Sequence, residues 1–155
     1  MSISQRLADL GIELPSVVPP VASYVPAMKV GATVRTSGQL PMRAGELVAT
    51  GQVPSRASVE DATAAARQCA LNALAAAADV AGGVDRLAGV IKVTGFVSSD
   101  PDFTAHPAVI NGASDFFHEI FGGLHVRSAV GVAALPLDAS VEVEVEFALA
   151  NPQSA

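Results

Sequence analysis

Near the C-terminus, hydrophobic and acidic positions alternate strictly in the segment SVEVEVEFAL, residues 140–149. Successive side chains of a strand point to opposite faces of a sheet, so this pattern predicts a strand with one buried and one solvated face. The buried set is Val141, Val143, Val145 and Phe147, and the solvated set is Glu142, Glu144 and Glu146.

The longest helical pattern covers residues 59–81. Ser58 is an N-cap residue, Glu60 and Asp61 suit the positive N-terminal end, and Gly82-Gly83 ends the helix. One face carries a stripe of small and apolar residues, which we expect to pack closely on a sheet as core: Ala62, Ala66, Cys69, Ala70, Ala73, Leu74 and Ala77.

Two further helices are predicted. A short one covers residues 2–10 and stops at Gly11, and a longer one begins around Pro107, which the first turn of a helix tolerates, and stops at Gly122-Gly123. Between the first helix and the next pattern, prolines in residues 15–26 predict an extended connector.

The remaining apolar runs predict strands. Residues 24–30 and 32–41 form a hairpin around Gly31, residues 42–56 form a loop with a short strand at 47–49, and residues 87–99 form one strand. Residues 125–135 and 140–149 form a second hairpin that turns near Leu137. The order favours an α+β fold with two main helices on one face of a mixed sheet, in one domain made of a 1–20 extension and a 21–150 core.

The composition predicts that copies of this domain associate with one another. The 155 residues are 50% hydrophobic and only 15% charged, against about 25% charged in typical soluble domains, so we expect an oligomer. The longest charge-free stretch, residues 14–28, contains four prolines and predicts no transmembrane span. One cysteine excludes an internal disulfide, no charged and apolar leader precedes Arg6, and a cytoplasmic location is expected.

The charges also limit the chemistry. The net charge is −6 and the nine basic residues are scattered, which disfavours nucleic-acid binding. The three histidines, at 106, 118 and 125, have no ligand spacing, so neither a metal site nor a cofactor is predicted.

Arg127 stands in an otherwise apolar strand and shares a face with Ala129 and Gly131, which leave room beside it. A guanidinium there suits bidentate binding of a carboxylate, and the alternative is an edge-strand ion pair with a strand glutamate. In the predicted hairpin, Arg127 and Glu142 lie roughly 15 to 20 Å apart at ~3.3 Å per residue. If both serve one site, they must meet across a subunit boundary.

Three segments, TSGQLP (36–41), VIKVTGFVSSDPDF (90–103) and HVRSAVGVAALPLDASVEVEVEF (125–147), resemble the RidA/YjgF family, also called the endoribonuclease L-PSP or translational-inhibitor family. The resemblance spans residues 24–148, and GIELP, NGASDFF and HVRSAVGV look like one branch of the family. It implies a chorismate-mutase-like fold and a homotrimer with a central β-barrel and three clefts between subunits.

The resemblance also implies a chemistry, the hydrolysis of reactive enamines and 2-imino acids to 2-oxo acids and ammonia. Arg127 would bind the substrate carboxylate and Glu142 would position the water. The other implied pocket residues are Tyr24, Ser37, Gly38, Asn111, Ala129 and His125. Ala129 and Gly131 stand where the deaminases commonly have cysteine and glutamate.

Two other functions remain open. The same cleft can serve a non-catalytic protein that binds 2-oxo acids or related metabolites. The family's older name records RNA cleavage, against which the acidic balance and the absence of a basic patch speak.

Overall fold

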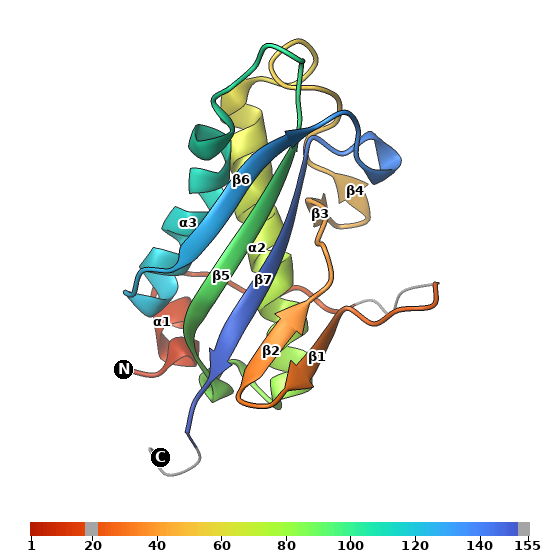
Figure 1. Cartoon of the computed structure of the whole chain (residues 1–155). Helices are drawn as coiled ribbons and strands as arrows, with labels where there is room; N and C mark the ends of the chain where they lie inside the picture. The colour runs from red at the N-terminus through yellow and green to blue at the C-terminus, as the bar shows by residue number, and fades with distance from the viewer. Residues whose placement is uncertain (18–21, 152–155) are drawn as a thin grey trace.

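The computed structural model describes residues 1–17 and 22–151, and part of the predicted 15–26 connector lies outside them. A five-stranded sheet stands in front of two long helices (Figure 1). The elements in chain order are α1 (Ile3–Asp9), β1 (Ala27–Val30), β2 (Thr33–Thr36), β3 (Met42–Arg43), β4 (Glu46–Leu47), α2 (Val59–Ala81), η1 (Val84–Arg86), β5 (Leu87–Ser98), α3 (His106–Phe121), β6 (Val126–Val132), η2 (Pro136–Asp138) and β7 (Val141–Leu149). The predicted α+β class with a mixed sheet is confirmed. Within the described residues, no helix is long and apolar enough to cross a membrane.

The strand order is β1-β2-β7-β5-β6, with β5 and β6 parallel and every other pair antiparallel. The predicted hairpin of residues 125–135 with 140–149 is therefore wrong, because β5 lies between β6 and β7. Gly95 of β5 is paired with Ala129 on one side and with Val143 on the other. Since β6 follows a helical crossover from β5, it returns parallel to β5. Alternation fixes the face of each side chain, but it does not identify the neighbouring strand.

The long helix α2 begins and ends as predicted. The Ser58 hydroxyl accepts a hydrogen bond from the Asp61 N–H at 3.0 Å, and Gly82 ends the helix with a left-handed φ of 85°. All seven residues of the predicted stripe are buried. Their small side chains let α2 lie close to β7 and to α3.

The small strands are shorter than predicted. Residues 24–26 do not extend β1, since Pro26 lacks the N–H that a ladder needs. Beyond the end of β2, the pairing with β7 continues as an isolated bridge between Gln39 and Val143. The predicted strand at 47–49 is replaced by β4, which pairs with β3 in a separate two-stranded sheet.

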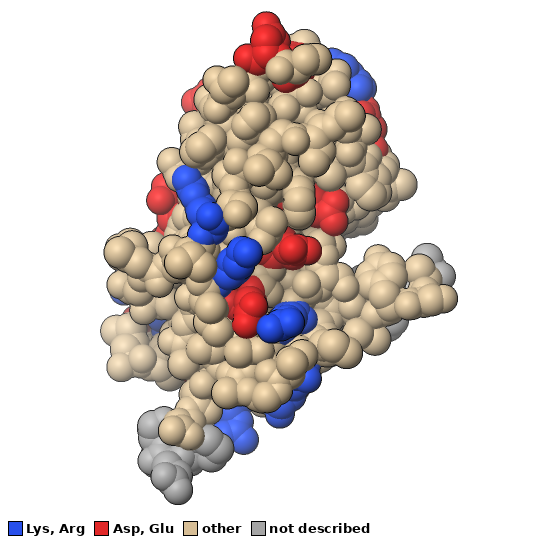
Figure 2. All heavy atoms as spheres, in the orientation of Figure 1, with Lys and Arg blue, Asp and Glu red and all other residues tan. Residues whose placement is uncertain are grey.

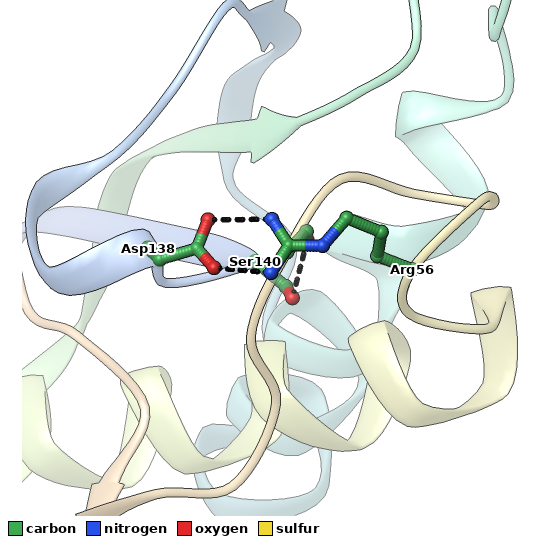
Figure 3. A network of polar contacts seen from close by, with 4 residues as sticks. Arg56, Asp138 and Ser140 are labelled. Carbon is green, nitrogen blue, oxygen red and sulfur yellow. Dashed lines mark hydrogen bonds and ion pairs between the residues drawn. The ribbon is translucent and has the colours of Figure 1, made fainter.

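At one end of the sheet, a network ties the loop before α2 to η2 (Figure 3). The Arg56 guanidinium donates to both carboxylate oxygens of Asp138, at 3.1 and 2.7 Å, and the Ser140 hydroxyl donates to the Gly51 carbonyl at 2.7 Å. Leu137 and Asp138 have left-handed φ angles of 58° and 60°. The network holds the turn that leads into β7 in this conformation.

The face of the sheet turned away from the helices is uncovered. Figure 2 shows a few charged groups among a mostly uncharged surface on this face. One row crosses the sheet from β6 to β1 and consists of Val126, Lys92, Glu146, Arg35 and Met28. Val126 and Met28 are 64% and 54% exposed, so apolar side chains stay open to solvent here.

Candidate functional site

Arg127 lies on the edge strand β6 and reaches the outer flank of α3. Its Nη1 donates to Asn111 Oδ1 at 2.8 Å and to Ser114 Oγ at 3.1 Å, and its Nη2 donates to the Pro107 carbonyl at 3.3 Å. Residues 107, 111 and 114 follow the spacing of one helix face. The edge-strand position agrees with the alternative interpretation of the sequence, but the partners come from α3 and not from a strand glutamate. We call Arg127, Asn111, Ser114 and His125 the arginine cluster.

These three bonds fix the orientation of the guanidinium. A guanidinium carries five N–H donors, and the bonds to α3 use three of them. The remaining two donors match the two oxygens of a carboxylate. Because Arg127 is only half-buried, a small anion can approach it.

His125 joins the arginine cluster through Ser114. The Ser114 hydroxyl lies 2.9 Å from His125 Nε2, and the Phe117 ring packs edge-on against the imidazole with ring centres 6.4 Å apart. Burial lowers the pKa of His125, and the nearby charges of Arg127 and His118 lower it further. Ser114 is absent from the sequence-based predictions. Its spacing of three residues from Asn111 on one helix was the signal that could have found it.

Along the same face of β6, Ala129 and Gly131 lie beyond Arg127. A Cβ at Gly131 would collide with His106 Nε2 and Ser99 Oγ, which are hydrogen-bonded to each other at 3.1 Å. The His106 imidazole therefore fills the space that a side chain at position 131 would need.

Glu142 lies on β7 beside Gly38, and we call Glu142, Gly38, Ser37 and Tyr24 the glutamate cluster. A Cβ on Gly38 would overlap the Glu142 carboxylate, so glycine is required for this approach. The Ser37 hydroxyl donates to the Val25 carbonyl at 2.6 Å and its N–H to the Pro26 carbonyl at 2.8 Å. These bonds hold the segment that carries Tyr24, whose side chain is 57% exposed.

Burial raises the pKa of Glu142, and the neighbouring Glu144 carboxylate raises it further. The pKa of the Cys69 thiol is also raised, mainly by its complete burial and secondarily by the Glu142 charge. Cys69 was predicted to be a core residue, and it is fully buried on α2. A carboxyl group with a raised pKa exchanges protons more readily near neutral pH. This property suits a general base that takes a proton from water.

The raised pKa of Glu142 predicts how stability depends on pH. Because the folded protein favours the protonated form, Glu142 disfavours folding increasingly as pH rises from the ordinary value of 4.5 through the raised pKa. Glu142→Gln should remove this loss, so the variant gains stability over the parent across that window, as urea unfolding at a series of pH values would show. Glu46→Gln, at an exposed position on β4, is the control. A constant difference between parent and Glu142→Gln at every pH would contradict the prediction.

The two clusters do not meet within one chain. Arg127 aligns with Val93 and Val145, both buried under the helices, whereas Glu142 aligns with Phe96 and with the half-exposed Val130. Side chains of these two rows point to opposite faces of the sheet. The helix face of β6 therefore holds the arginine cluster, and the open face of β7 holds Glu142.

Neither cluster lies in the surface hollow next to the N-terminal segment. That hollow has a volume of about 510 Å³ and is lined by Leu14 and Pro15 from the N-terminal segment and by Ala78 and Gly82 at the end of α2. Within residues 1–17 and 22–151, no group of three or more His, Cys, Asp or Glu side chains is placed to hold a metal ion.

Comparison with known proteins places the chain in a family. Residues 4–148 match the family model described as "YjgF/chorismate_mutase-like, putative endoribonuclease". The chain belongs to the RidA/YjgF family. The mixed sheet with helices on one face is the fold of this family.

Three proteins illustrate the relationship. Protein TCP17 of Trypanosoma cruzi is 40% identical over 96% of this chain and 95% of its own length. A 2-iminobutanoate/2-iminopropanoate deaminase of Dermatophagoides farinae is 34% identical over 86% of this chain and 91% of its own length. The crystal structure of Escherichia coli TdcF with bound serine superimposes with a TM-score of 0.61 at 30% identity, covering 86% of this chain and 92% of the other.

Proposed function

We propose that this protein is an enamine/imine deaminase that hydrolyses 2-imino acids to 2-oxo acids and ammonia. The observation that carries the proposal is the arginine cluster, in which α3 anchors three donors of Arg127 and leaves two for a carboxylate. Relatives named 2-iminobutanoate/2-iminopropanoate deaminase, 34% identical to this chain, support the reaction class.

The proposed reaction needs little from the protein beyond positioning. Water adds its oxygen to the imine carbon, the new hydroxyl gives up a proton to the nitrogen, and the carbon–nitrogen bond breaks to release ammonia and leave a carbonyl. Arg127 holds the carboxylate next to the reacting carbon, and Glu142 accepts a proton from the attacking water and returns it to the nitrogen. The Asn111 amide N–H2 is a further donor near the carboxylate, since its oxygen already accepts from Arg127.

The proposed active site lies between two copies of the chain, in a homotrimer. The placement of Arg127 and Glu142 on opposite faces of one sheet supports this arrangement, because a shared site then needs a neighbour's cluster. The uncovered face of the sheet, with Met28 and Val126 more than half exposed, supplies apolar surface for burial between copies. Tyr24, Ser37 and Gly38 would line the cleft from the copy that supplies Glu142.

The reaction can be tested directly. An amino-acid oxidase generates the imine in solution, and its decay is followed with and without the pure protein. We expect the decay rate to rise in proportion to protein concentration and the products to be the 2-oxo acid and ammonia in equal amounts. Unchanged decay at every protein concentration would refute the deaminase proposal.

A second candidate function is non-catalytic binding of small carboxylates in the same cleft. The bound serine of TdcF favours it, since serine carries a carboxylate and is not an imine. Saturable binding of pyruvate or 2-oxobutyrate by calorimetry, without any acceleration of imine decay, would assign this function. The absence of both binding and turnover would exclude both candidates.

A further inference from the structure

The hydrogen bonds around Ser114 connect the Arg127 guanidinium to the His125 imidazole. Its oxygen accepts from Arg127 Nη1 at 3.1 Å, so the single hydroxyl proton is available for His125 Nε2, 2.9 Å away. A nitrogen that accepts this proton belongs to a neutral imidazole with its own proton on Nδ1. When His125 is protonated, the Ser114 oxygen accepts from both Arg127 and His125, and its hydroxyl proton is released for another acceptor.

We propose that Ser114 is a positioning residue for Arg127 and that His125, acting through Ser114, makes carboxylate binding stronger at lower pH. This inference rests on the proposed role of Arg127 in carboxylate binding. His125 itself does not contact the ligand in this arrangement, in contrast to the direct contact that the sequence suggested.

The surroundings of His125 support the coupling. The imidazole, just before β6, contacts Ser114 and Phe117 of α3. The charged or titratable groups that act on it are Arg127 from β6 and His118 from α3. Both disfavour the imidazolium, and burial does so more strongly, so the pKa of His125 lies below the ordinary value of 6.5. A carboxylate on Arg127 would supply the only opposing charge among these partners and would favour the imidazolium.

The sign of the pH dependence follows by linkage. A ligand that favours the protonated form of His125 binds that form more tightly. Affinity for the carboxylate should therefore rise as pH falls through the pKa of His125, from a plateau at high pH to a second plateau below it. A shift of one pKa unit on binding corresponds to about a tenfold change in affinity, and we expect about threefold to tenfold between pH 8 and pH 5.

The binding test uses calorimetry with pyruvate as probe at a series of pH values. Ser114→Ala should weaken binding at every pH, because Arg127 loses an anchor, and should flatten the pH dependence. Ser114→Thr keeps the hydroxyl and should restore both. His125→Gln keeps an amide near Ser114 but cannot titrate, so its affinity should stay at the high-pH plateau throughout.

A second test needs no ligand and so stands apart from the proposed function. The titration of the His125 ring, followed by NMR, should have its midpoint below 6.5 in the parent and in Ser114→Thr. In Ser114→Ala the midpoint should rise, because the neutral imidazole loses its donor. His118→Gln is the comparison variant, because it leaves the Ser114 bonds in place and should raise the midpoint only by the loss of one neighbouring charge.

The outcomes separate the two proposals. If pyruvate does not bind at any pH while the NMR midpoints behave as described, the proposed function fails and the hydrogen-bond chain stands. If pyruvate binds through Arg127 but Ser114→Ala changes neither the pH profile nor the His125 midpoint, Ser114 is merely structural and the inference is overturned.

Discussion

Arg127→Met is expected to lower kcat/KM for a 2-imino acid by about 100-fold, which corresponds to about 3 kcal/mol for the loss of two charge-assisted hydrogen bonds. Methionine keeps the unbranched stem against α3, so packing changes little. Arg127→Lys keeps the charge but loses the planar fork, and an intermediate loss of about tenfold is expected. The measurement is imine decay at limiting substrate, with a circular dichroism spectrum to verify the fold.

A second experiment mixes two inactive variants and tests whether the active site is formed by two copies of the chain. Arg127→Met and Glu142→Gln should each be nearly inactive alone. When the two variants are unfolded together and refolded as mixed trimers, some interfaces combine the intact Arg127 of one copy with the intact Glu142 of its neighbour. For random mixing in a closed ring of three, about a quarter of the sites regain both groups.

Two outcomes would contradict the shared site. If the mixture is no more active than the separate variants, although size measurements confirm mixed assemblies, then both residues do not act across an interface. If Arg127→Met retains full activity on its own, Arg127 does not bind the substrate carboxylate. Mixing two samples of Arg127→Met gives the baseline.

Gly112→Ala is expected to destabilise the protein by about 2 to 3 kcal/mol, as for overpacking in a tight contact. Gly112 lies inside α3, where it touches α2, and a Cβ there would overlap the Thr63 carbonyl oxygen. At an exposed helical position, the same change would stabilise by about 1 kcal/mol. The change in the free energy of unfolding therefore has the opposite sign at Gly112, because α2 and α3 pack closely there.

Urea unfolding gives the measurement for Gly112→Ala. The control is Gly123→Ala, since nothing lies within 4 Å of a Cβ at that position. The control should change stability by no more than about 0.5 kcal/mol. A neutral or stabilising Gly112→Ala would show that α2 and α3 can separate at no cost.

The sequence predicted the elements whose patterns are local. Ser58, the alanine stripe and Gly82 determine α2, since capping, small side chains and a left-handed terminator act within a few residues. The alternation of residues 140–149 likewise determined which side chains of β7 are buried. The predicted ends of the strands at 24–30 and 32–41 were less accurate. The sequence does not show at which residue a strand stops pairing with its neighbour.

The candidate site was only partly accessible to sequence reasoning. Arg127 stood out as a charge in an apolar strand, but its anchoring by Ser114 and the Pro107 carbonyl depends on how α3 lies over β6. The role of Gly38 was also hidden, since the need for a missing Cβ arises only where Glu142 approaches it.

The sequence by itself determined the RidA/YjgF resemblance, the helices, the strand faces and the identity of Arg127 and Glu142 as the residues to examine. The tertiary structure alone decided the strand order, which inserts β5 between β6 and β7 and replaces the predicted hairpin. Strand pairing joins residues far apart in the chain, and no local pattern encodes the partner. In this sheet, Arg127 and Glu142 lie on opposite faces of two strands that are not neighbours. The distance of roughly 15 to 20 Å, which assumed a hairpin, therefore does not apply.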